Sequence, residues 1–154
     1  MRVAQEKVAE FHDKYGYANP GKPQLLPQSD VEFRTGLIRE ELNEYEDANR
    51  DRDLVEVADG LADLLYVVLG TCVFHGIDVQ SIFDEVHRSN MTKELSRDAA
   101  NKPIKGATFE RPRVAELLLI QSTGLAEFDA ERSPYSKKMD EHERDTWEDY
   151  LGER

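Results

Sequence analysis

The residues of this chain that could do chemistry are acidic side chains at helical spacing in two neighbouring segments. Glu40, Glu41 and Glu44 lie close together in the first segment, and Asp59 and Asp63 lie one turn apart in the second, which is strongly apolar. Carboxylates on a stripe that faces the core repel one another and lose their hydration. A bound divalent cation is the simplest counter-charge. The pattern therefore indicates a metal site between two packed helices and favours an enzyme.

Oxygen donors of this kind suit Mg²⁺, which prefers carboxylates and usually keeps some of its water. Two facing helices, each giving two carboxylates one turn apart, place four anionic groups around one point. We expect this set to be Glu41 and Glu44 with Asp59 and Asp63, with Mg²⁺ as the cofactor and Mn²⁺ able to replace it. These segments hold no His/Cys cluster and no Glu-x-x-His pair, so neither zinc nor a ferritin-like di-iron site is expected.

A carboxylate beyond these four could accept a proton from an attacking water, and the residues alone leave Glu40 and Glu56 open for that role. The alternative interpretation of an acid-rich helix is a solvated face. We adopt it for the acids that lie outside the stripe, Glu46, Asp47, Asp51 and Asp53. We do not adopt it for Asp59 and Asp63, because their helix is apolar nearly all round and should be the central, buried one.

Hydrophobic spacing predicts an all-α fold, an antiparallel bundle of four to five main helices. The predicted helices span residues 2–15, about 29–50, 54–75, about 79–94 and 112–124. Ser29 or Asp30 is expected to cap the second helix, and Asp78 the fourth. Gly16 and Gly76 are expected to end the first and the third. Because only a short turn separates the second and third helices, they should be antiparallel neighbours.

A second group of polar residues ends the fourth predicted helix, where Asn90 and Lys93 are one turn apart. An amide next to an ammonium could bind a phosphate and a sugar. An ordinary C-terminal helix turn, where basic residues favour the helix dipole, explains the same pattern. In the basic loop that follows, Lys102 and Lys105 could close over a phosphate or could simply be solvated. Tyr66 is a core residue by default, although its ring could stack on a base.

The composition excludes several classes of protein. A net charge of −12 over 154 residues argues against gripping the nucleic-acid backbone or an anionic membrane by overall charge. The longest apolar run, residues 61–74, is interrupted by Asp63 and is expected to be too short to span a bilayer. No signal-peptide pattern opens the sequence, so we expect a cytoplasmic protein. One domain is expected, with residues 1–110 as its functional part and 111–154 as a C-terminal helical extension.

Three short motifs, taken in order, resemble those of the MazG-like all-α nucleoside triphosphate pyrophosphohydrolases. They are Glu40-Glu41-x-x-Glu44, Ala-Asp-Leu-Leu-Tyr-Val at 62–67, and Val-His-Arg-Ser-Asn-Met-Thr-Lys at 86–93. That superfamily includes phosphoribosyl-ATP pyrophosphohydrolases, all-α dUTPases and dCTPases. The resemblance covers about residues 30–106. It implies Mg²⁺-dependent cleavage of a (deoxy)nucleoside triphosphate between its α- and β-phosphates, which gives a nucleoside monophosphate and pyrophosphate.

Within this class, dUTP and dCTP are the first substrates to expect, and phosphoribosyl-ATP is the alternative. The alternative of another class is a helical interaction module without catalysis, which a divalent ion stabilises. By position, the resemblance makes Glu41 and Glu44 metal ligands and Glu40 a ligand or the base that activates water. Asn90 and Lys93 would contact the substrate. The resemblance also implies an oligomer, a homodimer or a dimer of dimers, whose active site a neighbouring subunit often completes.

The chain departs from the superfamily's usual Glu-x-x-Asp pair in the second motif. Glu56-Val57-Ala58-Asp59 matches that pair literally. If Ala-Asp-Leu-Leu-Tyr is aligned instead, Asp63 is the usual aspartate, and Gly60 stands where the glutamate should be. Asp59, one turn before Asp63, would then replace the glutamate. We favour this second alignment because its apolar surroundings fit better, and it leaves Glu56 as a possible additional ligand.

Overall fold

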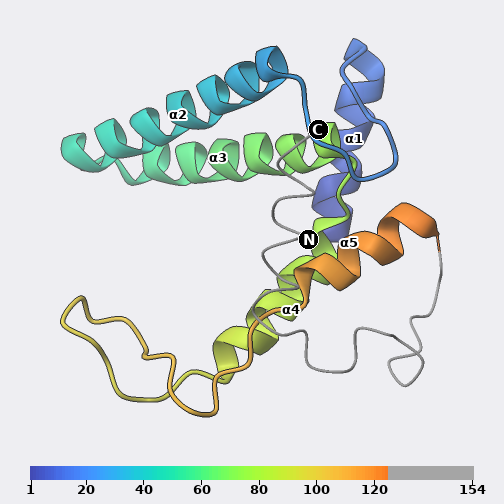
Figure 1. Ribbon diagram of the computed structural model, residues 1–154. Helices are drawn as coiled ribbons and strands as arrows, with labels where there is room; N and C mark the ends of the chain where they lie inside the picture. The colour runs from blue at the N-terminus through green and yellow to red at the C-terminus, as the bar shows by residue number, and fades with distance from the viewer. Residues whose placement is uncertain (125–154) are drawn as a thin grey trace. The chain divides into compact units, whose positions relative to one another are not determined.

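The computed structural model describes residues 1–124 and shows five helices (Figure 1). They are α1 (Arg2–Tyr15), α2 (Gln28–Asp51), α3 (Leu54–His75), α4 (Val79–Met91) and α5 (Val114–Thr123). In this part of the chain the only extended pairing is an isolated bridge between Arg97 and Pro103. The predicted all-α helix bundle is therefore confirmed. Residues 1–123 form one compact unit, and the predicted division at residue 110 stays a prediction. The part of the expected C-terminal helical extension that follows residue 124 lies outside the described residues.

Most helix ends follow the local sequence signals. Gly16 and Gly76 adopt the left-handed conformation and end α1 and α3 as predicted, since only glycine adopts it without strain. Asp78 accepts a hydrogen bond from Gln80 N at 3.0 Å and caps α4 as predicted. The predicted cap of α2 is wrong, because the helix begins a residue earlier and Pro27 occupies the cap position. The predicted end of α4 is also wrong by three residues, because Thr92 is already its C-terminal cap.

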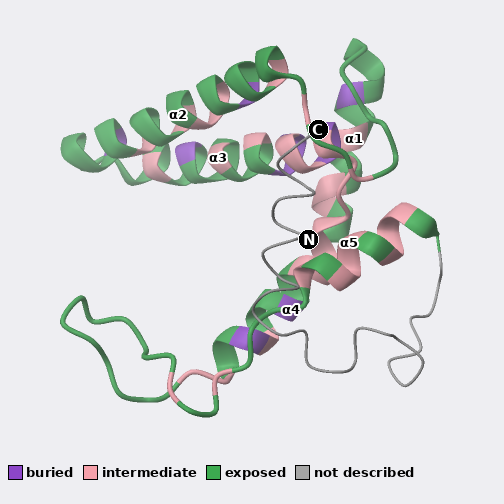
Figure 2. Ribbon diagram, in the orientation of Figure 1, coloured by how far each residue is buried: buried purple, intermediate pink, exposed green. Residues whose placement is uncertain are grey.

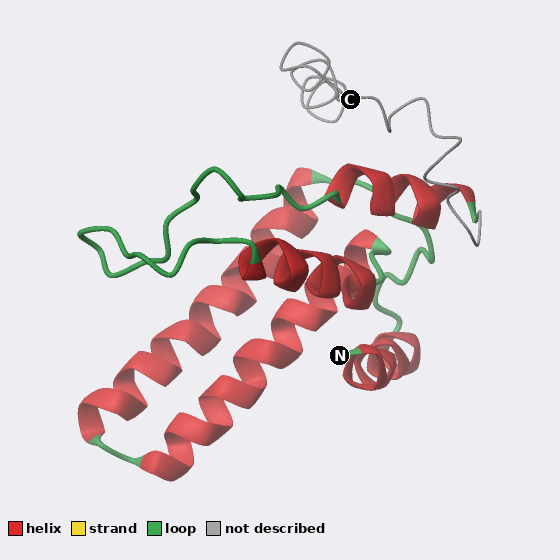
Figure 3. Ribbon diagram, turned by 90° about the horizontal axis from the view of Figure 1, so that it is seen from below, coloured by secondary structure: helices red, strands yellow, loops and turns green. Residues whose placement is uncertain are grey.

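The helices α2 and α3 form the most extensive packing contact in the described part of the chain. Figure 3 shows them side by side along their length, joined at one end by a short turn, which confirms the expected antiparallel pair. At that turn Arg52 takes a left-handed conformation, and Asp53 accepts hydrogen bonds from Val55 N and Glu56 N. This second capping aspartate fixes where α3 starts and therefore which of its residues face α2.

The buried core is small and lies where α1 crosses α3. Val8, Leu69 and Val73 are almost fully buried there. The expectation that α3 is a buried central helix is wrong for this chain by itself, since much of its apolar surface is exposed (Figure 2). Leu54 is 80% exposed and Leu61 and Leu65 are each 48% exposed. Apolar periodicity shows that a helix must be covered, but it does not show that the same chain covers it.

By length and composition α3 could cross a membrane, and it is the only described helix that could. The helix has 22 residues and includes the apolar run at 61–74, which is by itself shorter than a bilayer requires. The same test is passed by core helices of globular proteins, and α3 packs against both α1 and α2. The finding is therefore weak evidence for a membrane span.

A network of charged residues joins α4 to the chain that leads into α5. Glu85 is 8% exposed and accepts hydrogen bonds from Arg88 Nη2 at 2.8 Å and from Arg113 N at 3.0 Å. Arg88 also pairs with Glu110, and Ser89 Oγ donates to the Glu110 carbonyl at 2.7 Å. These hydrogen bonds, those of Arg88 above all, hold the pKa of Glu85 down at about 2. The network fixes the last turns of α4 against the loop that returns to α5.

The depressed pKa of Glu85 makes a testable contribution to stability. A carboxylate whose pKa is lower in the folded state stabilises the fold above its ordinary pKa, and this stabilisation is lost as the pH falls through about 2. We expect Glu85→Gln to lower the free energy of unfolding by about 2 kcal/mol at pH 7. The deficit should shrink as the pH falls from ~4.5 to ~2. Urea unfolding across this pH range measures it, with the exposed neighbour Asp84→Asn as control. A deficit that does not depend on pH would contradict the assignment.

Candidate active site

The predicted carboxylates lie on the two helices that pack most extensively. Glu40, Glu41 and Glu44 are in the second half of α2, and Asp59 and Asp63 are in the first half of α3. Since the helices are antiparallel neighbours, these two halves face each other. Glu41 is half-buried in the seam between them, whereas the other four carboxylates are exposed at its edge.

Electrostatics show that the structure brings these side chains together. The pKa of Glu41 is raised, first by burial and then by the negative charges of Glu44, Asp63, Glu40 and Asp59. Together with Glu41 itself, these are the base and the four metal ligands expected from the sequence. We refer to them below as the carboxylate cluster. Glu56, the additional candidate, is exposed and is not among the groups that raise the pKa of Glu41.

Two expectations about the cluster need correction. Asp59 and Asp63 were expected to be buried, but both are exposed because α3 is only partly covered. In addition, no three acidic, histidine or cysteine side chains among residues 1–124 are gathered closely enough to hold a metal ion. The helix backbones therefore bring the carboxylates into one region, and their side chains would have to converge to coordinate a cation. The donor set itself, carboxylates alone, fits Mg²⁺.

Gly60 explains why the helices approach so closely at the cluster. A Cβ atom at this position would lie 3.3 Å from the Cα and N atoms of Tyr45 on α2. A glutamate here would therefore press on the backbone of the facing helix. Gly60 is thus a packing residue, and in the sequence it lies between Asp59 and Asp63.

Aromatic side chains extend from the cluster towards α1. Tyr66, one turn after Asp63, meets the ring of Phe11 edge-on at 5.7 Å and is 38% exposed, so it is not a core residue. Burial raises the pKa of its phenol, as do the neighbouring Glu10 and Tyr15. The ring of Tyr17, in the connector after α1, stacks on that of Phe33 of α2 at 6.3 Å. Of these rings only Tyr66 was expected from the sequence, although Phe33 precedes Glu40 by seven residues and so shares its face of α2.

The other predicted substrate residues lie elsewhere in this chain. Asn90 is exposed in the last turn of α4, and Lys93 is half-buried just beyond it, with its N donating to the Asn90 carbonyl. α4 makes its main contacts with α5 and α1, and Figure 1 shows it running away from the α2–α3 pair. Lys105 lies over the ring of Phe109 at 5.1 Å in the loop before α5. Within one chain, therefore, the structure does not bring these residues to the carboxylate cluster.

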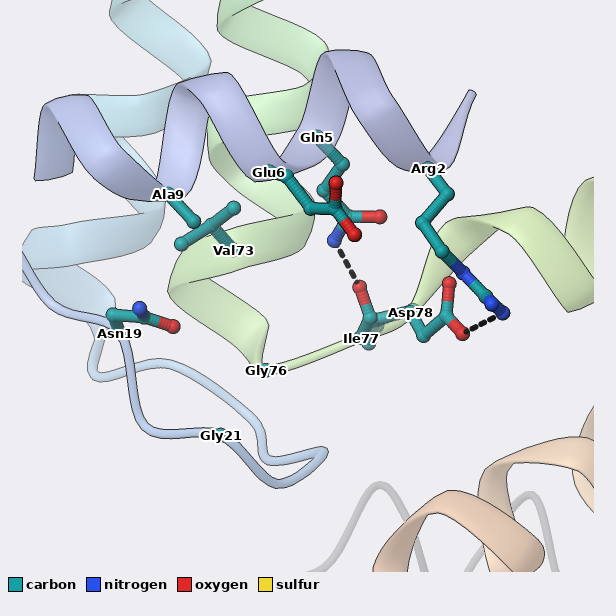
Figure 4. Close-up of a pocket in the computed structure, with 10 residues that line it drawn as sticks. All are labelled: Arg2, Gln5, Glu6, Ala9, Asn19, Gly21, Val73, Gly76, Ile77 and Asp78. Atoms are coloured by element: carbon teal, nitrogen blue, oxygen red, sulfur yellow. Dashed lines mark hydrogen bonds and ion pairs between the residues drawn. The ribbon is translucent and has the colours of Figure 1, made fainter.

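Two cavities in the described residues also lie away from the cluster. One, of about 280 Å³, is formed by α1, the following connector and the turn between α3 and α4 (Figure 4). Its polar groups largely satisfy one another: Gln5 Nε2 donates to the Ile77 carbonyl at 2.6 Å, and Arg2 pairs with Asp78. The other, of about 410 Å³, lies between α4 and α5 beside Glu85. Neither is lined by a cluster carboxylate.

An all-α bundle and a match to a family model together identify the chain as a member of the MazG-like pyrophosphohydrolases. The family model of phosphoribosyl-ATP pyrophosphohydrolase matches residues 8–90, more than half of the chain, and the chain belongs to that family. No curated protein matches it. The match begins in α1, earlier than the three motifs indicated, and ends at Asn90. The carboxylate cluster lies inside it, whereas Lys93 and Lys105 lie beyond its end.

The raised pKa of Glu41 predicts how metal-free stability depends on pH. A carboxyl group whose pKa is higher in the folded state stabilises the fold most below its ordinary pKa, and this contribution is lost as the pH rises through the raised value. Without metal, we expect Glu41→Gln to be more stable than the wild type at pH 7 and no more stable at pH 3. Thermal unfolding in chelator measures this, with Glu46→Gln on the solvated face as control. A Glu41→Gln variant less stable than the wild type at pH 7 would contradict the crowding of charge.

Proposed function

We propose that the chain hydrolyses a (deoxy)nucleoside triphosphate between its α- and β-phosphates, with Mg²⁺ held by the carboxylate cluster. The observation that carries the proposal is the raised pKa of Glu41 among four other carboxylates. An apoprotein that crowds negative charge in this way gains stability from a divalent cation. Membership of a pyrophosphohydrolase family supports the chemistry, since it makes a phosphoanhydride the bond to be cleaved.

The roles of the residues follow from their places in the seam. Glu41 and Glu44 on α2, with Asp59 and Asp63 on α3, are the proposed ligands. When bound, Mg²⁺ would neutralise phosphate oxygens and favour departure of pyrophosphate. Glu40, exposed at the edge of the cluster, accepts the proton as a water oxygen bonds to phosphorus and the bond to the leaving pyrophosphate breaks.

The proposed active site needs a second copy of the chain. The exposed apolar residues of α3 form a surface that a homodimer would cover, and Leu54, Leu61 and Leu65 are its most exposed leucines. Asn90 and Lys93, which lie away from the cluster of their own chain, would then contact the substrate held by a neighbouring subunit. A nucleotide substrate and a second copy of this chain are therefore the proposed partners.

The choice of substrate rests on two different observations. The exposed ring of Tyr66, one turn from Asp63, provides a surface on which the base of dUTP or dCTP could stack. The description of the matching family favours phosphoribosyl-ATP instead. Both substrates carry the same phosphoanhydride, so the cluster would cleave them by the same chemistry.

A panel of triphosphates tests the proposal directly. Each nucleoside and deoxynucleoside triphosphate, and phosphoribosyl-ATP, is incubated with protein and Mg²⁺, and phosphate is measured with and without inorganic pyrophosphatase. We expect phosphate only when pyrophosphatase is present, because cleavage between the α- and β-phosphates releases pyrophosphate. The best substrate identifies the base. If Mg²⁺ raises the melting temperature but no nucleotide is cleaved, the chain is a metal-stabilised interaction module and the proposal fails.

Substitutions in the cluster test the assigned roles. We expect Glu41→Gln and Asp63→Asn to lower kcat/KM by about 100-fold or more, since each removes a ligand charge. Glu40→Gln should lower kcat by a similar factor, as expected for loss of a general base. Glu46→Gln, on the solvated face of the same helix, should retain wild-type activity. Circular dichroism establishes that each variant is folded. Full activity in both Glu41→Gln and Asp63→Asn would exclude the cluster as the active site.

A further inference from the structure

Arg34 is a buried cation without an acidic partner. Its side chain is on α2, its residue is 5% exposed, and no carboxylate in the described residues lies within ion-pair distance of it. A buried charge without a counter-ion is costly, and it persists where something else compensates it. Here the guanidinium donates from Nη2 to the Val67 carbonyl at 2.7 Å and from Nε to Thr71 Oγ1 at 3.2 Å. Both acceptors belong to α3.

These two hydrogen bonds are the only ones by which a described side chain of α2 is joined to α3. The guanidinium also lies over the ring of Phe74 at 4.9 Å and over that of Phe33 at 5.8 Å. The aromatic faces and the two acceptors together fix both the position and the plane of the group. A lysine at this position could make a hydrogen bond but could not reproduce the planar stacking.

Gly70 of α3 provides the space for this guanidinium. A Cβ atom there would lie 2.5 Å from Arg34 Nη2 and 3.1 Å from Nε2 of the buried His12. The ring of His12 lies beside Phe74, and its Nδ1 is 3.1 Å from the Ala18 carbonyl, so it is held as a packing residue. The guanidinium of Arg34 thus occupies the space that a side chain at position 70 would fill.

Two contacts of this kind lie along the part of the α2–α3 seam that carries most of the carboxylate cluster. Tyr45 meets Gly60 at one point of the seam, and Arg34 meets Gly70 at another. Arg34 precedes Tyr45 by eleven residues on α2, and Gly70 follows Gly60 by ten residues on α3. These nearly equal and opposite steps are what antiparallel packing requires. Glu41 lies between Arg34 and Tyr45 on α2, and Asp63 lies between Gly60 and Gly70 on α3. The two contacts therefore determine which residue of α3 faces Glu41.

We propose that Arg34, seated over Gly70, is a positioning residue that fixes the register of α2 on α3 and so holds the two halves of the carboxylate cluster together. It acts through the helices and does not touch the substrate. The catalytic consequence rests on the proposed function, whereas the effect on helix register does not. Loss of the guanidinium removes both side-chain hydrogen bonds between the helices and leaves their register to the Gly60 contact and the remaining packing.

Helix register can be measured without any enzymatic activity. In a Cys72→Ala background, spin labels at Glu32→Cys on α2 and Ala58→Cys on α3 lie at different levels of the pair, so a slide changes their separation. Labelled chains are diluted with unlabelled chains, and distances are measured by double electron–electron resonance. We expect Arg34→Met to shift the mean separation by ~1.5 Å, the rise of one helical residue, or to broaden its distribution. Arg39→Met, an exposed arginine on the same helix, should leave it unchanged.

The same variants test the consequence for the site. We expect Arg34→Met to weaken Mn²⁺ binding and lower kcat/KM by about tenfold or more in folded protein, as loss of a supporting residue around a metal site does. Arg34→Lys should lie between wild type and Arg34→Met, and it provides the test if Arg34→Met does not fold. Gly70→Ala should have a similar effect by displacing the guanidinium, and it should add little to Arg34→Met in a double mutant.

The outcomes separate the two proposals. Unchanged label distances, Mn²⁺ affinity and turnover in folded Arg34→Met would overturn the positioning role. Additive effects of Gly70→Ala and Arg34→Met would also overturn it, because the two positions would then act independently. If the wild type neither binds Mn²⁺ nor cleaves any nucleotide, the proposed function fails, while the label distances still decide the role of Arg34.

Discussion

The close packing of α2 against α3 is the constraint on which the rest of the structure depends. At Gly60 the backbones approach until a single Cβ atom would meet Tyr45 at 3.3 Å. This approach brings Glu41 among four other carboxylates and raises its pKa. Repulsion among these carboxylates opposes the folding of the metal-free chain, so the packing that builds the proposed site also destabilises the fold. A divalent cation would neutralise that repulsion, so binding of the cation would stabilise the packing of α2 against α3.

Two separate sets of contacts attach the other helices to this pair and to one another. The small core of Val8, Leu69 and Val73 attaches α1 to α3, while the network centred on Glu85 attaches the end of α4 to the chain before α5. The first supports the side of the α2–α3 pair that carries the aromatic rings. The second holds Asn90 at the end of an ordered helix, although far from the carboxylates of the same chain. Both positions make sense if a neighbouring subunit brings the two parts together.

The exposed apolar surface of α3 is consistent with that view. A helix with Leu54 at 80% exposure and Leu61 and Leu65 each near half exposure is unusual on the surface of a monomer. Covering it with a second copy would also bury the surroundings of Asp59 and Asp63, which the single chain leaves exposed. The electrostatic cost of the cluster would then rise, and so would the stabilisation that a bound cation provides.

The sequence by itself determined the helices and the residues that share a face. Glycines at positions 16 and 76 and the aspartate at 78 mark helix ends through local backbone preferences, and the spacing of the acids places them on one stripe of each helix. Only the tertiary structure decided how far α2 lies along α3, that Gly60 and Gly70 are contact points, and that Arg34 is buried between the helices. It also decided that Asp59 and Asp63 stay exposed in one chain. Periodicity is a property of neighbouring residues, whereas register and burial depend on contacts between residues far apart in the sequence, including those that another subunit would supply.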